Sequence, residues 1–338
     1  MIEQRDTSRY HYLDLMRGLA IFFMIMQHAM IIHEVSEGEG DTLIGNIFIL
    51  LGTAPAAPVF LFILGVFVAN SKKSSPENIV RGIRLFVFGY IFNVLRFTIP
   101  ALIGGAPYSN GNAPLDLLLI VDIFQVAGLS LIFLGVIKKI VKPRILFLVM
   151  IPAVLLVSPK LWGIGNNSPL LSPFTGVGGN VTFPLFPWII FPLLGMYLNP
   201  YLLQRQLPWK ALLLTGALAG LAGFFTLDLF SESDYSRLDF GTGLILISFV
   251  LFWTAISGFT VRYLLKSRFS IVAKTLFYWS RNVTPIFIIQ WMIYGWSSLL
   301  IGVNKQNDVV SVLIGFSVLI VTHLLIKHTQ VKNVIPIL

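Results

Sequence analysis

The chain has 338 residues, of which 56% are hydrophobic and only 12% are charged. A soluble globular domain carries about 25% charged residues, so this composition excludes a soluble protein and indicates an all-α polytopic membrane protein. The net charge is +9, which would suit a nucleic-acid partner only if the basic residues formed one surface. The chain has no cysteine, which excludes disulfides and thiolate chemistry.

Ten apolar windows are long enough to be membrane-spanning helices, because a helix needs about 20 apolar residues to cross a bilayer. We therefore expect one transmembrane domain over residues 1–338, built as a bundle of about ten helices. In chain order the windows are 13–34, 54–71, 80–99, 116–138, 144–159, 183–199, 208–229, 241–263, 282–302 and 308–328.

The basic residues collect between alternate windows. With a cytoplasmic N-terminus, 20 of the 24 Lys and Arg residues fall in cytoplasmic segments, three fall outside (Lys160, Arg237 and Lys305) and Arg96 lies within the third window. This asymmetry predicts that both termini are cytoplasmic, and it accounts for the net charge without a nucleic-acid partner. The 20 residues are Arg5, Arg9, Arg17, Lys72, Lys73, Arg81, Arg84, Lys138, Lys139, Lys142, Arg144, Arg205, Lys210, Arg262, Lys266, Arg268, Lys274, Arg281, Lys327 and Lys332.

Ionisable residues inside membrane spans are costly and usually face the bundle interior or a watery cavity, and the first window has three. Arg17 and His28 are eleven positions apart, which places them about 20° apart around a helix and about 16 Å apart along it. Asp14 precedes Arg17 by three residues and is expected to pair with it. Asp14 and Arg17 also suit a plain ion pair at the headgroups, whereas His28 lies deep in the hydrocarbon and is a candidate general base.

The fourth window places Asp122 and Gln125 three residues apart within a predicted helix. A buried carboxylate beside a buried amide suits two roles. The pair either orients the imidazole of His28 in a polar cavity or forms a structural hydrogen bond between helices.

The ninth window begins with Arg281 and Asn282 at its cytoplasmic end and has Gln290 near its middle. Pro285 favours a kink there, because proline cannot donate the hydrogen bond of a regular helix. At the end of the first window, His33 and the acidic loop after it are candidates for a cation site. We prefer a solvated loop, so no metal is expected.

The segment from Tyr12 to Ala20, followed by His28, resembles the first helix of multi-spanning membrane acyltransferases. It is similar to the acyltransferase-3 group and, more closely, to bacterial relatives of heparan-α-glucosaminide N-acetyltransferase, whose signature is an arginine followed after ten residues by a histidine. The resemblance runs from about residue 9 to about residue 295. Further matching segments are Pro58–Gly65, Arg81–Arg84, Val121–Gln125, Phe186–Gly195 and Ser280–Asn282.

The resemblance implies a bundle of about ten helices that moves an acyl group, by default acetyl, from cytoplasmic acyl-CoA to a hydroxyl or amine, commonly on a saccharide or glycolipid. It implies that His28 is the essential histidine and that Arg17 belongs to the acyl-donor site. From the residues themselves, we take Asp122 as the catalytic partner of His28, with Gln125 as the alternative. The remaining donor-site candidates are Asp14, Arg81, Arg84, Arg281 and Asn282, and the acceptor-site candidates are Gln125, Gln290 and His33. Many relatives have a histidine where this chain has Gln290.

A second function fits the same residues without the resemblance. A proton-coupled transporter or flippase of a small anionic or lipid-linked substrate would also use Arg17 and His28, as a binding and proton-relay pair. The resemblance favours the acyltransferase, with acyl-CoA as co-substrate, no metal, and a location in the lipid bilayer of a prokaryotic cytoplasmic membrane. The acceptor, the acyl length and the oligomeric state, including a homodimer, stay open.

Overall fold

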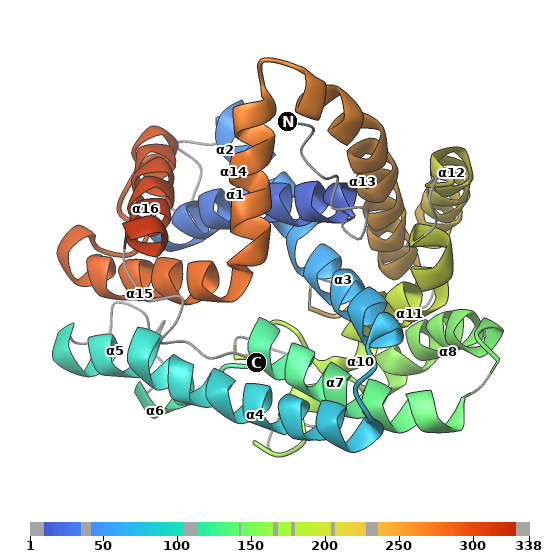
Figure 1. Ribbon diagram of the computed structural model, residues 1–338. Helices are drawn as coiled ribbons and strands as arrows, with labels where there is room; N and C mark the ends of the chain where they lie inside the picture. Colours follow the sequence, from blue (N-terminus) through green and yellow to red (C-terminus); the bar gives the residue numbers. More distant parts are fainter. Residues whose placement is uncertain are drawn as a thin grey trace.

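The computed structural model describes residues 10–34, 42–104, 114–141, 143–164, 168–176, 180–203, 207–227 and 236–328. Five of the predicted cytoplasmic basic residues (Arg5, Arg9, Lys142, Arg205 and Lys332) lie outside these ranges. Within them the fold is helical (Figure 1). The elements are α1 (His11–His33), α2 (Leu43–Thr53), α3 (Ala56–Asn70), α4 (Ser75–Asn93), η1 (Val94–Thr98), α5 (Ile99–Gly104), α6 (Pro114–Leu118), α7 (Ile123–Ile140), α8 (Ile145–Leu161), α9 (Ser172–Thr175), α10 (Leu185–Trp188), α11 (Ile190–Leu202), α12 (Trp209–Phe225), α13 (Phe240–Lys266), α14 (Ser270–Arg281), α15 (Val283–Ile301) and α16 (Asp308–His328).

Eight helical stretches in the described part of the chain are long and apolar enough to cross a membrane. This confirms an all-α, multi-pass membrane protein. The two further windows that the sequence predicted, 144–159 and 208–229, correspond to α8 and α12, which are apolar but have only 17 residues each. The count of ten crossings and the orientation of the termini therefore stay predictions. The eight stretches are His11–His33, Leu43–Asn70, Ser75–Gly104, Ile123–Ile140, Leu185–Leu202, Phe240–Lys266, Val283–Ile301 and Asp308–His328.

The helices differ from the predicted windows at one start, at one division and in two short helices. The helix expected over 116–138 is wrong at its start, because α7 begins at Ile123. The helix expected over 183–199 is divided into α10 and α11, with Phe186 outside the helical backbone region. The short helices α2 and α14 were not predicted, because neither reaches the length of a membrane span.

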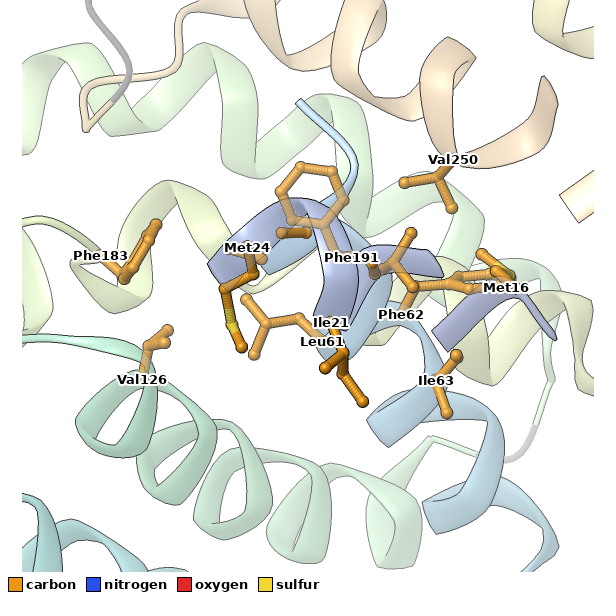
Figure 2. Close-up of a cluster of buried hydrophobic side chains, with 14 of the residues drawn as sticks. Met16, Ile21, Met24, Leu61, Phe62, Ile63, Val126, Phe183, Phe191 and Val250 are labelled. Carbon is orange, nitrogen blue, oxygen red and sulfur yellow. The ribbon is translucent and has the colours of Figure 1, made fainter. Parts of the chain in front are cut away.

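Helix α1 is the centre of the bundle and packs against α2, α3, α13, α14, α15 and α16. Figure 1 shows it crossing the middle of the molecule, while α4 and α5 follow one another along one edge. Apolar side chains from α1, α3, α7, α11 and α13 meet in the core around it (Figure 2). The labelled members are Met16, Ile21, Met24, Leu61, Phe62, Ile63, Val126, Phe183, Phe191 and Val250.

The helical stretch from Ser75 to Gly104 widens into a π-helical turn at η1, where the Ile99 amide donates to the carbonyl of Val94. The cause is Pro100, which lacks the N–H that would bond to the carbonyl of Arg96 and whose ring would clash with that carbonyl in a regular helix. The freed carbonyl of Arg96 lies directly against Gly295 of α15, where there is no room for a Cβ. The π turn thus presents Arg96 to α15.

Two glycines in the segments that carry the family resemblance allow α3 and α11 to pack closely. A Cβ on Gly65 would overlap the carbonyl oxygen of Pro192, and a Cβ on Gly195 would overlap that of Phe62. We expect Gly65→Ala and Gly195→Ala each to lower the free energy of unfolding by about 1–3 kcal/mol, because overpacking forces the backbones apart. Denaturant unfolding in detergent measures this. Gly216→Ala is the control, since its nearest neighbour would lie 3.3 Å away, and an equal loss there would contradict the explanation.

Candidate active site

One end of α1 holds the predicted Asp14 and Arg17, joined by a serine from α14. Arg17 Nη2 lies 3.6 Å from Asp14 Oδ1, which confirms the expected ion pair. Ser280 completes the group: its hydroxyl donates to Asp14 Oδ1 at 2.7 Å and accepts from Arg17 Nε at 2.9 Å. The approach of α14 depends on Gly18, where a Cβ would overlap the carbonyl of Leu276. The guanidinium is therefore held in one orientation.

Arg17 lines a cavity of about 360 Å³, which we call the inner cavity. Its polar lining comes from Arg17, Arg81, Ser71 and Thr284, and its apolar walls come from α3, α4, α7 and α15. Arg17 Cζ lies 5.4 Å from the centre of the Phe67 ring. A mostly apolar space whose wall includes two arginines suits a ligand with an anionic head and an uncharged arm.

Four of the predicted donor-site residues do not line this cavity, and of these Asp14 contacts it only through its ion pair with Arg17. Arg84 and Arg281 are exposed, and Arg281 donates to the carbonyl of Phe277. The Asn282 side chain donates to the carbonyl of Tyr278 at 2.8 Å. Of the four arginines predicted for the donor site, only Arg17 and Arg81 line the inner cavity.

A second cavity of about 410 Å³, the outer cavity, is lined by His28 and Asp122. His28 Nδ1 lies 3.2 Å from Gln290 Nε2, and the imidazole lies over the Trp291 ring with the ring centres 4.4 Å apart. The rest of the lining includes the polar side chain of Gln27 and mostly apolar residues of α2, α3 and α7. The predicted His28 and the predicted Gln290 are thus brought together from opposite ends of the sequence.

Asp122 is not part of a helix, as the sequence suggested, but the residue that caps α7. Its Oδ1 accepts from the Ile123 amide at 2.7 Å, and Gln125 Oε1 accepts from the Asp122 amide at 3.1 Å. The i, i+3 spacing that we read as two residues on one helical face is therefore a capping box. Gln125 is fully buried and also donates to the carbonyl of Ile120. The imidazole contact considered for Asp122 or Gln125 is made by Gln290 instead.

The other oxygen of Asp122 forms an ion pair with Arg96, a residue to which the sequence assigned no role. Arg96 Nη2 lies 2.6 Å from Asp122 Oδ2, and Arg96 is only 1% exposed. Asn93 Oδ1 accepts from Arg96 Nε and Nη2, while the Asn93 amide donates to the carbonyls of Leu118 and Ile120. The guanidinium lies against four aromatic rings, those of Phe92, Phe97, Phe287 and Trp291.

His33 lies in neither cavity. Its Nδ1 is 3.0 Å from the carbonyl oxygen of Gly302, and its own carbonyl accepts from the amides of Lys305 and Gln306. It therefore fixes the connection between α15 and α16, which is a structural position. Within the described ranges no group of three or more His, Asp or Glu side chains is arranged to hold a metal ion.

The two cavities share part of their walls. Phe60 of α3, Ile123 of α7 and Phe287 of α15 line both of them. Arg17 and His28, which the helical repeat places on one side of α1, thus belong to separate spaces divided by three apolar side chains. We call these three residues the dividing wall.

The sequence contained a signal for Arg96 that was not used. Arg96 lies within an apolar window, where a charge is costly, and Pro100 follows it by four residues, where it interrupts the helical hydrogen bonds. Ser280 lies in a segment that carries the family resemblance, but its contact with Arg17 could not be read from it, and Trp291 and Phe287 gave no signal, because these roles depend on contacts between distant segments.

The similarity of this chain to known proteins extends over nearly all of the bundle. Residues 10–326 match the acyltransferase-3 family model, which is described as an acyltransferase domain. The match begins at the residue before α1 and ends in α16, so it includes both cavities. No curated protein matches the chain.

Proposed function

Because the chain belongs to the acyltransferase-3 family, we propose that it moves an acyl group, acetyl by default, from cytoplasmic acyl-CoA to a hydroxyl or amine of a saccharide or glycolipid acceptor outside. The observation that carries the proposal is the pair of adjoining cavities. The inner one has arginines and the outer one has His28. A ligand that reaches from one to the other must be long, thin and anionic at one end, as acyl-CoA is.

The donor would bind in the inner cavity, with its phosphates at Arg17 and Arg81 and its pantetheine arm along the apolar wall. Charge-assisted hydrogen bonds from arginine are well suited to phosphate oxygens. Arg84 and Arg281 are exposed and do not line this cavity, so neither belongs to the proposed donor site. The thioester would then pass the dividing wall and enter the space beside His28.

The proposed reaction is direct transfer. Acceptor oxygen or nitrogen bonds to the thioester carbonyl carbon while His28 Nε2 takes the acceptor proton. The carbon–sulfur bond then breaks, and the same proton passes from His28 to the sulfur to give the CoA thiol. General-base assistance of this kind is typically worth about 10²–10⁴ in rate.

This role requires a particular orientation of the Gln290 amide. Nε2 of His28 can accept a proton only if Nδ1 carries the other one, so Nδ1–H must donate to Gln290 Oε1. In the structure Nε2 of the amide faces His28, and Oε1 is buried with no hydrogen-bond partner among the described residues. Rotation of the amide by 180° gives Oε1 a donor and leaves His28 Nε2 free. Amide oxygen and nitrogen are exchanged by this rotation without other movement.

We expect Arg17→Ala to raise the KM for acyl-CoA by about 10–100-fold, since a hydrogen bond to a charged group contributes about 1.5–3 kcal/mol. Arg81→Ala should act in the same direction. Arg84 lies on α4, as Arg81 does, but outside the inner cavity. Arg84→Ala therefore removes the same charge without changing the cavity, and it serves as the control. Steady-state kinetics at saturating acceptor measure the effect, and equal KM values for Arg17→Ala and Arg84→Ala would count against the donor site.

The activity itself is tested in two steps. Purified protein in lipid nanodiscs should bind radiolabelled acetyl-CoA, and mass spectrometry of envelope glycans and lipids should show an acyl mass that disappears without the protein. Failure to bind acetyl-CoA, together with uptake of a solute into proteoliposomes, would instead support a transporter.

A further inference from the structure

A third cavity lies apart from the two described above, between α14 and α16. It has a volume of about 220 Å³ and is lined by five residues that belong to neither the inner nor the outer cavity. Three come from α14 and two from the last turns of α16. The residues are Lys274, Thr275, Tyr278, His323 and Lys327.

The polar side chains that line this cavity can all donate hydrogen bonds. The indole Nε1 of Trp279 lies 3.0 Å from His323 Nδ1. Indole can only donate, so Nδ1 accepts and the proton of the neutral imidazole must be on Nε2, which is then a donor as well. The two lysine ammonium groups add donors with positive charge. No carboxylate lines the cavity among the described residues.

The hydroxyl of Tyr278 strengthens this assignment. Its oxygen is buried and has no hydrogen-bond partner in the described part of the chain. Burial raises the pKa of Tyr278, so the hydroxyl keeps its proton and can donate it. A buried hydroxyl without a partner is costly, and an acceptor bound beside it would remove that cost.

The surroundings of the cavity indicate that the hydrogen-bond acceptor belongs to a lipid. Helix α16 carries a row of exposed apolar side chains up to this cavity, including Ile320, Val321 and Leu324, and Ile271 on α14 is 67% exposed. Acyl chains would lie along this surface while the headgroup reached the donors. Lysines in pockets between helices on the cytoplasmic side are suited to anionic lipid headgroups.

We propose that the cavity formed by Lys274, Tyr278, His323 and Lys327 is a binding site for the phosphate of an anionic phospholipid, distinct from the acyl-donor site. Lys274 and Lys327 supply the charge. Tyr278 and His323 supply neutral donors that fix the position of the phosphate. The site does not depend on the proposed acyl transfer.

The test is native mass spectrometry of the delipidated full-length protein titrated with phosphatidylglycerol. Lys274→Gln/Lys327→Gln should bind the lipid about 30-fold more weakly, since each lysine near a membrane surface contributes about 1 kcal/mol. The matched control is Lys72→Gln/Lys73→Gln, which removes two exposed lysines from the connection between α3 and α4. It should bind like the unmodified protein.

Two results would overturn the proposal. One is equal lipid affinity in the two double variants, which would mean general attraction to a basic surface. The other is binding of inorganic phosphate, but not phosphatidylglycerol, in a manner sensitive to Lys274→Gln/Lys327→Gln, which would mean a site for a soluble anion. Tyr278→Phe removes only a hydroxyl that has no hydrogen-bond partner among the described residues, so it should fold normally and still lower lipid affinity. Unchanged affinity in Tyr278→Phe would contradict the assigned contact.

Discussion

His28→Ala is expected to lower the turnover number for acyl transfer by about 10²–10⁴, the range that a general base contributes, while acyl-CoA affinity stays nearly unchanged. The physical reason is the separation of the two cavities. His28 lines only the outer one, and the arginines that would hold the donor line only the inner one. Single-turnover kinetics combined with binding of labelled acetyl-CoA measure the two quantities separately.

Two further variants make this result specific. His328→Ala removes an exposed histidine from the end of α16 and should leave turnover unchanged. Gln290→Leu removes the only side-chain hydrogen bond of His28 that the structure contains among the described residues. It should reduce turnover and change its pH profile while donor binding is kept. Normal turnover in His28→Ala would reject the histidine as base.

Asp122→Asn should lower the free energy of unfolding by about 3–5 kcal/mol, because it leaves the buried guanidinium of Arg96 without its counter-charge. Asparagine keeps the size of the residue and still caps the helix, so the loss reports the charge rather than the cap of α7. Arg96 is 1% exposed and has no route to solvent for its charge. Denaturant unfolding in detergent, followed by circular dichroism, measures the change.

A double-mutant cycle supplies the control for Asp122→Asn. Arg96→Met fits an apolar side chain among the four aromatic rings that surround the guanidinium. Removing both charges is often nearly neutral where removing one is not, so Arg96→Met/Asp122→Asn should recover most of the lost stability. If the single and double variants are equally unstable, the ion pair is not the cause.

Hydropathy predicted most of the bundle because the bilayer imposes a minimum length on each span. Windows such as 282–302 and 308–328 agree closely with α15 and α16. The same criterion cannot detect α14, whose 12 residues pack against α1 without the length to cross the membrane. Hydropathy also extended the fourth window through Asp122, although α7 begins only at Ile123. A hydropathy average over many residues is not changed enough by one capping residue to mark the start of the helix.

Only the part of the candidate site that lies on a single helix could be placed from the sequence. The 3.6-residue repeat placed Asp14, Arg17 and His28 on one side of α1 without knowledge of the neighbours. The partners of these residues are Ser280 and Gln290, which lie more than 260 positions away. Such pairs depend on the packing of α14 and α15 around α1, and no local pattern encodes them.

The dividing wall has a consequence for the membrane itself. A membrane that stores a potential loses energy through any continuous watery path, at about 2.3 kcal/mol for each elementary charge per 100 mV. Phe60, Ile123 and Phe287 interrupt the path between the arginine-lined and histidine-lined spaces with carbon atoms alone. A thin arm could part such side chains, whereas their carbon atoms offer hydrated ions and protons no hydrogen bond. The dividing wall would therefore keep the two spaces electrically separate even while the arm of a donor, as proposed above, passes between them.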